Sequence, residues 1–165
     1  MVVPVGKMIT EKDNLFMKMA CDLACENVGQ GGGPFGTVIV RDGEVIAAAG
    51  NTVTIDCDPT AHAVMNAIRR ACSLTRDYKL DGCVAYCSCE PCPMCLSALY
   101  WAGVSRIYYG NAADDAGRVN KGYSFICKEL EKPHLDRAIP CIHIQGATAH
   151  EAFDKWEAKK DRIEY

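Results

Sequence analysis

The chain has 165 residues, of which 49 % are hydrophobic and 24 % charged, and its formal net charge at pH 7 is −3. These values are typical of a single folded domain with its own core, and they exclude an intrinsically disordered chain. No apolar run approaches the roughly 20 residues that span a bilayer, and the slight acidity offers no basic field to nucleic acid. We therefore expect neither a membrane nor a nucleic acid as partner.

Cysteine is unusually frequent in this chain. There are 11 cysteines, an odd number, and the first residues do not resemble a secretory signal. We therefore expect a cytoplasmic protein whose thiols stay reduced. In that setting most cysteines are small buried apolar residues, and a few are candidates for metal ligands.

The first half of the chain predicts a helix followed by a hairpin. Thr10 and Asp13 form a capping-box pattern, and apolar residues at helical spacing continue it over 11–28. Two short apolar runs, 37–40 and 46–49, flank an Asp-Gly pair that is typical of a tight hairpin turn.

The rest of the chain alternates between helical and extended patterns. We expect helices over 61–72, 91–101 and 149–160, short helical pieces within 110–132, and strands over 83–87, 106–109 and 139–144. Such alternation favours a layered α/β fold with a mixed sheet. We find no repeat and no linker, so residues 1–165 are expected to form one domain.

A histidine and a Cys-x-x-Cys pair are candidate metal ligands. Cys92 and Cys95 lie at the predicted start of one helix, and His62 lies at the start of another. Two thiolates and an imidazole suit Zn²⁺ with one position left open, and a helix N-terminus favours the thiolate form. Taken singly, the cysteines also fit a redox pair or two core thiols, and the histidine a structural role. Their joint arrangement is the one known for zinc nucleobase deaminases.

Several motifs together resemble the cytidine deaminase superfamily, and within it the bacterial guanine deaminase branch. They cover most of the chain in compatible order: 32–36 (GGPFG), 58–62 (DPTAH), 88–95 (SCEPCPMC), 124–125 (SF) with 128–129 (KE), and 164–165 (EY). The resemblance implies a three-layer α/β/α fold with a mixed five-stranded sheet and a metal held at two helix N-termini.

The resemblance also implies a chemistry. A zinc ion on His62, Cys92 and Cys95 would acidify a water that attacks the amino-bearing carbon of a purine base or a related heterocycle, and ammonia would leave. Asn51 matches an asparagine that hydrogen-bonds the base.

Three further features are implied by the same resemblance. Phe35 matches a wall of the substrate pocket. Tyr165 matches a terminal tyrosine that reaches the active site of the other subunit. The expected assembly is therefore a homodimer with an exchanged C-terminal segment.

The chain departs from the family at the residue that moves protons. The family motif is His-Ala-Glu, but here the third residue is Val64. The missing glutamate is not a zinc ligand; it carries protons to the ring nitrogen and to the leaving ammonia. Losing such help typically costs about 10²- to 10⁴-fold in rate. The resemblance therefore predicts a deaminase that is impaired or altered.

A second departure concerns the recognition of the base. Tyr123 stands where the guanine deaminase branch has an aspartate that accepts hydrogen bonds from guanine. We expect Tyr123 to lie in the substrate site as a neutral aromatic residue.

Two other functions stay open beside the deaminase. One is a non-catalytic subunit that keeps the zinc fold for binding or assembly. The other is a diverged enzyme that uses zinc for a different hydrolytic or addition reaction.

Overall fold

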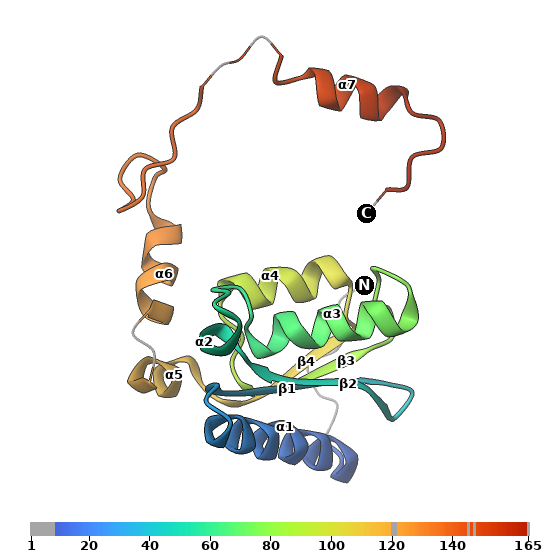
Figure 1. Ribbon diagram of the computed structural model, residues 1–165, viewed down its shortest axis with the longest axis vertical. Coiled ribbons are helices and arrows are strands. Elements are labelled where there is room, and N and C mark those ends of the chain that lie inside the picture. The colour runs from blue at the N-terminus through green and yellow to red at the C-terminus, as the bar shows by residue number, and fades with distance from the viewer. Residues whose placement is uncertain (1–8, 120–121, 145, 147, 165) are drawn as a thin grey trace. The chain divides into compact units, whose positions relative to one another are not determined.

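The computed structural model describes residues 9–119, 122–144, 146 and 148–164. The chain divides into two compact units, Met1–Ser124 and Phe125–Tyr165, and each is described by itself (Figure 1). The first unit contains the sheet and the candidate site.

Helix α1 (Glu11–Gly29) opens the first unit as the sequence predicts. The Thr10 side chain accepts from the Asp13 backbone N–H, and the Asp13 carboxylate accepts from the Thr10 backbone N–H, which forms a capping box. Phe16, Ala20 and Ala24 follow at four-residue spacing and form the buried face. Through this apolar stripe the helix packs against the sheet.

Four strands form one mixed sheet: β1 (Gly33–Arg41), β2 (Glu44–Asn51), β3 (Val84–Cys89) and β4 (Arg106–Asn111). Their order is β2-β1-β3-β4. Strand β1 is antiparallel to β2 and β3, whereas β3 is parallel to β4. Asp42 and Gly43 both have positive φ and make the predicted hairpin turn.

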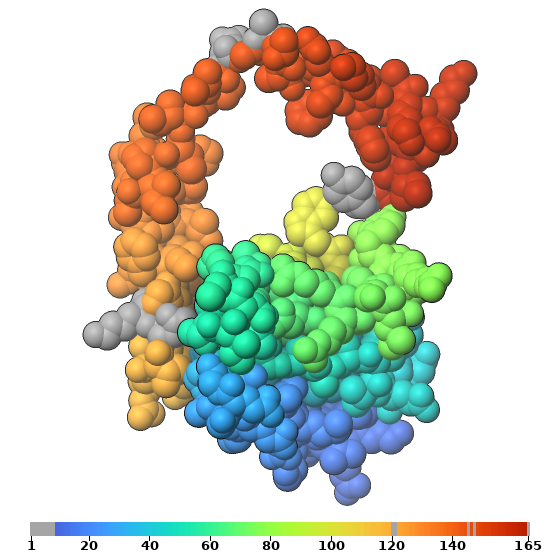
Figure 2. Space-filling model, viewed as in Figure 1, coloured from blue at the N-terminus to red at the C-terminus, as the bar shows by residue number. Residues whose placement is uncertain are grey.

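The remaining helices are α2 (Val53–Asp56), α3 (Ala63–Thr75), α4 (Pro93–Ala102), α5 (Ala113–Val119), α6 (Gly122–Glu131) and α7 (Glu151–Ala158). Helices α3 and α4 cover the sheet face opposite α1 (Figure 1). In the space-filling view, atoms of α1, the sheet and α3 fill three successive layers (Figure 2). The predicted three-layer α/β/α architecture is confirmed. None of the helices in the described part of the chain could cross a membrane.

Successive side chains along each strand point to opposite faces of the sheet and pack in a hydrophobic core on either face. Val38 and Tyr86 pack with Phe16 on the α1 face. Ile39 packs with Ala67 on the other face, which α3 covers. Because neighbouring strand residues point to opposite faces, each strand supports both helical layers. The α3 and α4 face is the one that holds the candidate metal ligands.

The predicted fifth strand over 139–144 is wrong, because the sheet has four strands. These residues form no strand, and Ile139, Ile142 and Ile144 are exposed. Their β-branched side chains favour extended backbone, but a strand also needs a neighbour to pair with. The described residues of the second unit offer no such neighbour.

Candidate metal centre

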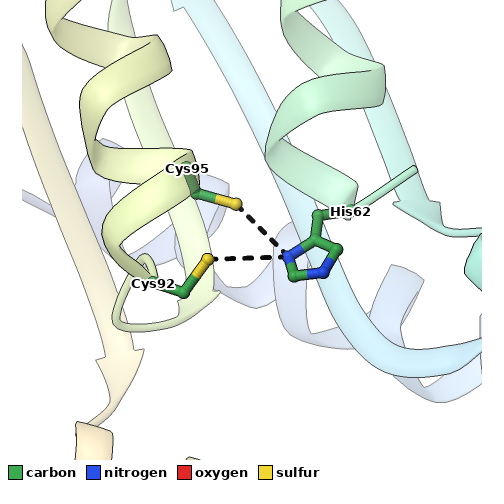
Figure 3. Close-up of side chains that lie close together, drawn as sticks. All are labelled: His62, Cys92 and Cys95. Carbon is green, nitrogen blue, oxygen red and sulfur yellow. Dashed lines mark hydrogen bonds between the residues drawn. The ribbon is translucent and has the colours of Figure 1, made fainter. Parts of the chain in front are cut away.

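Two helix starts bring together the three predicted ligands. His62 is the N-cap of α3, Cys92 is the N-cap of α4, and Cys95 is the third residue of α4. Pro93 follows at the first helical position, where its missing N–H costs no hydrogen bond. Strand β3 leads into α4, so the sheet fixes where this helix begins. The three side chains point toward one another (Figure 3).

The separations of these side chains fit a tetrahedral zinc site. Their ligand atoms all lie within 4.8 Å of one another. The His62 Nδ1 is 3.7 Å from the Cys92 Sγ and 3.5 Å from the Cys95 Sγ. Zinc–sulfur bonds of about 2.3 Å and zinc–nitrogen bonds of about 2.0 Å at a tetrahedral angle place N and S about 3.5 Å apart. The ligand set therefore matches zinc in both donor chemistry and spacing.

The electrostatic environment favours a negative charge on the cysteine pair, which suits the binding of a cation. The hydrogen bond with Cys95 lowers the pKa of Cys92 to about 4, and the nearby His62 adds to this effect. The same hydrogen bond, together with burial, raises the pKa of Cys95. The pair thus shares one proton between two sulfurs. Metal binding at such a pair releases that proton.

The surroundings leave one coordination position open. In residues 9–119 and the other described segments, no further His, Cys, Asp or Glu joins this group. Cys87 packs close by, but burial raises its pKa to about 12, which keeps its thiol neutral. Three protein ligands with an open position are typical of catalytic zinc sites.

Val64 lies next to these ligands, at the second position of α3. Its side chain is buried, at 5 % exposure, in a cluster with Cys95, Cys87, Ala85 and Leu99. None of these side chains carries a carboxylate. The position at which the sequence analysis expected a proton carrier is therefore apolar.

Glu90, the acid nearest in sequence to the cysteines, has another role. Its Oε2 accepts a hydrogen bond from the Ala113 backbone N–H at the start of α5. Its own backbone N–H donates to the Asn111 carbonyl. These bonds tie the β3–α4 loop to the end of β4, so Glu90 supports the loop that carries Cys92.

Asn51 ends β2 and is buried. Its Oδ1 accepts from the Val53 backbone N–H at 3.3 Å, and its Nδ2 has no hydrogen-bond partner among the described residues. Thr52 donates its backbone N–H to the carbonyl of Ala61, the residue before His62. One backbone hydrogen bond therefore ties the residue after Asn51 to the residue before the candidate ligand His62.

The other predicted substrate residues are placed less closely. Phe35 is half-buried in β1, and alternation puts it on the same sheet face as Thr37 and Ile39. That face is the one covered by α3. Tyr123 is the second residue of α6 and is half-buried. Tyr165 lies outside the described residues.

Two asparagines that the sequence analysis did not single out hold the end of β2. Asn27 donates from Nδ2 to the carbonyls of Gly33 and Asn51, both at 2.7 Å. Asn66 donates from its own Nδ2 to the carbonyl of Gly50 at 3.1 Å. Asparagine is a poor residue for a helix interior. An asparagine inside α1 and another inside α3 were therefore the sequence signal that these side chains bond to another part of the chain.

Comparison with known proteins identifies the family. The cytidine and deoxycytidylate deaminase zinc-binding region matches residues 10–111. The chain belongs to this family. Zinc is therefore its metal, and the His-Cys-Cys group is able to hold it.

Guanine deaminase from Bacillus subtilis is a close relative. The two chains are 46 % identical over 151 residues, which are 91 % of this chain and 97 % of the relative. The X-ray structure of the Bacillus subtilis guanine deaminase superposes with a TM-score of 0.89 and covers 92 % of this chain and 98 % of that one. Together with the fold, this kinship makes the chain a zinc-type nucleobase deaminase.

More distant relatives include a deaminase of tRNA adenosine and a second guanine deaminase. A tRNA-specific adenosine deaminase from Aquifex aeolicus is 34 % identical over 124 residues, covering 75 % of this chain and 80 % of the relative. The structure of guanine deaminase from Nitrosomonas europaea matches at 28 % identity with a TM-score of 0.62, over 68 % of this chain and 65 % of that one. The family thus places different aminated bases on one fold.

Proposed function

We propose that this chain hydrolyses the amino group of a purine base or a related aminated heterocycle, and that Val64 makes this reaction slow. The observation that carries the proposal is the convergence of His62, Cys92 and Cys95 at tetrahedral spacing from two helix starts. The kinship with guanine deaminase supports a purine as the substrate. When bound, zinc would supply an acidified water as the nucleophile.

The chain's own residues divide the remaining work. Asn51 orients the base through the Nδ2 donor that the protein leaves unused. Phe35 lines the pocket from the sheet face under α3. His62, Cys92 and Cys95 hold the metal, and Val64 leaves proton transfer to solvent or to the substrate itself.

The residue at position 123 is the reason why we do not restrict the proposed substrate to guanine. Tyr123 offers a hydroxyl and a ring instead of a carboxylate, so it cannot accept two N–H groups as an aspartate does. We therefore include 2-aminopurine, pterins and cytosine beside guanine in the test. Ammonia release from the purified, zinc-loaded protein tests the proposal.

A non-catalytic binding or assembly subunit is the second candidate function. The apolar packing of Val64 favours it, because no carboxylate stands where the family moves its protons. Binding of a purine without ammonia release, even after the glutamate is restored, would support this alternative. A different zinc-dependent hydrolysis or addition would instead show product from substrates that carry no amino group.

The Asn51 role gives a direct prediction. Asn51→Ala is expected to weaken binding of the guanine analogue 8-azaguanine by about tenfold or more, because a positioned hydrogen bond to the base is lost. Zinc content should stay at about one per chain. Titration calorimetry measures the affinity, with the exposed Asn14→Ala as a matched control. Equal affinity in both variants would remove Asn51 from the site.

We also propose a homodimer of deaminase domains that exchange their C-terminal segments. No described residue of the second unit is buried. Large apolar side chains stay exposed along it: Phe125, Ile126, Leu130, Leu135, Ile139, Ile142, Ile144, Phe153, Trp156 and Ile163. So many exposed apolar residues favour a partner surface. The cytoplasmic location stays a prediction.

A complementation experiment tests the exchange. Deleting residues 161–165 is expected to weaken 8-azaguanine binding, because each tail would complete the partner's site through Tyr165. Mixing this deletion with Asn51→Ala protein should restore binding, since one site of each mixed dimer then has an intact Asn51 and an intact tail. A monomer in light scattering, or no restoration on mixing, would contradict the exchange.

A further inference from the structure

We propose that Asn66 is a positioning residue that sets where Asn51 lies relative to the zinc ligand His62. The inference rests on the proposed function, because it concerns how the base is held beside the metal. Asn66 touches neither the base nor the metal in this proposal. It acts through the backbone on either side of the two residues that do.

The contacts of Asn66 converge on both parts of the site. Its Nδ2 donates to the Gly50 carbonyl at 3.1 Å, the Thr52 hydroxyl at 2.9 Å and the Ala61 carbonyl at 3.3 Å. Gly50 and Thr52 are the two neighbours of Asn51, and Ala61 is the residue before His62. One amide group therefore bridges the end of β2 and the segment that delivers the first ligand.

The backbone of Asn66 adds a fourth hydrogen bond. Its N–H donates to the His62 carbonyl at 2.9 Å, which is the first hydrogen bond of α3. Asn66 thus lies one turn after the ligand, on the helix whose cap the ligand forms. Because the backbone of Asn66 is fixed at the start of α3, a shift of its side chain would change the position of the end of β2 relative to His62.

The orientation of the amide follows from its partners. The Gly50 and Ala61 carbonyls only accept hydrogen bonds, so the nitrogen of the Asn66 amide must face them. Its oxygen lies on the other side, where the Arg69 guanidinium donates at 3.5 Å. An aspartate has nearly the same shape but would set a carboxylate against two carbonyl oxygens.

On the α1 face of the sheet, the end of β2 has no free space into which it could shift if the Asn66 contacts were lost. Asn27 holds the Asn51 carbonyl from α1, and its Oδ1 lies 2.3 Å from where a Cβ on Gly50 would be. Only glycine fits at that position. Asn27 packs against one side of the end of β2 and Asn66 is hydrogen-bonded to the other side. Together they restrain the position of this backbone segment.

The test is Asn66→Asp, compared with Tyr86→Phe. The control removes one hydrogen bond, from the Tyr86 hydroxyl to the Asp13 Oδ1, on the α1 face of the same sheet. Both variants are expected to lower the melting temperature. Only Asn66→Asp is expected to weaken 8-azaguanine binding, by about tenfold, while zinc stays at about one per chain by elemental analysis.

The outcomes separate the inference from the proposed function. If the unmodified protein binds 8-azaguanine and Asn66→Asp binds it equally well, the positioning role is overturned and the proposed function stands. If the unmodified protein binds neither 8-azaguanine nor any of the other test bases, both fall. Should Asn66→Asp fail to fold, Thr52→Val removes one of the same hydrogen bonds from the other end. An affinity unchanged in Thr52→Val then overturns the inference.

Discussion

Replacing Val64 by glutamate is expected to raise the rate of purine deamination by about 10²- to 10⁴-fold. The substitution restores a carboxylate at the second position of α3, two residues after the proposed ligand His62. A carboxylate there can accept a proton from the nucleophile and give it to the ring nitrogen or to the leaving ammonia. Ammonia release from guanine and the other bases, measured at saturating zinc, gives the ratio of rates.

Val64→Gln is the matched control for this gain. Glutamine has the size and polarity of glutamate but does not carry a proton between groups. Both substitutions place a polar group in an apolar cluster, so each should lower the free energy of unfolding by about 1–3 kcal/mol. A rise in rate with glutamate alone assigns the effect to proton transfer. If neither variant releases ammonia from any base, the deaminase proposal loses its support and the binding-subunit alternative gains it.

The metal centre was predictable because its residues leave local signatures. Pro93 marks the first position of a helix, and this places Cys92 at the cap and Cys95 in the first turn before any coordinates are known. The structure confirms both positions. His62 follows the same logic, since the Asp58-Pro59 pair precedes the helix that it caps. Short-range rules of helix initiation were enough to bring three ligands to two helix ends.

The residues that support the centre leave no such signature. Asn27 and Asn66 bond to backbone groups that lie 24 and 16 positions away in the chain. A single side chain that meets a distant carbonyl produces no periodic pattern, so only its unfavourable place in a helix marks it. The failed strand at 139–144 has a related cause, because its composition favours extended chain while pairing depends on a distant partner.

Replacing Cys92 by alanine is expected to reduce bound zinc from about one ion per chain to almost none. The change removes one of three protein ligands, and it also removes the sulfur with the lowered pKa. Zinc binding adds to folding stability because the assembled site exists only in the folded chain. The melting temperature in the presence of zinc should therefore fall in the variant. Elemental analysis and thermal unfolding with and without added zinc measure both effects.

Cys87→Ala is the control that separates a ligand from a packed thiol. Cys87 lies in the same buried cluster as Cys95, and burial keeps its thiol neutral by raising its pKa to about 12. Its removal should cost packing energy but leave zinc in place, so added zinc should still raise the melting temperature. Acidification should release zinc from the unmodified protein, because protons compete with the metal for both sulfurs. Zinc retained at one per chain in Cys92→Ala would contradict the proposed ligand set, and with it the placement of the substrate beside His62.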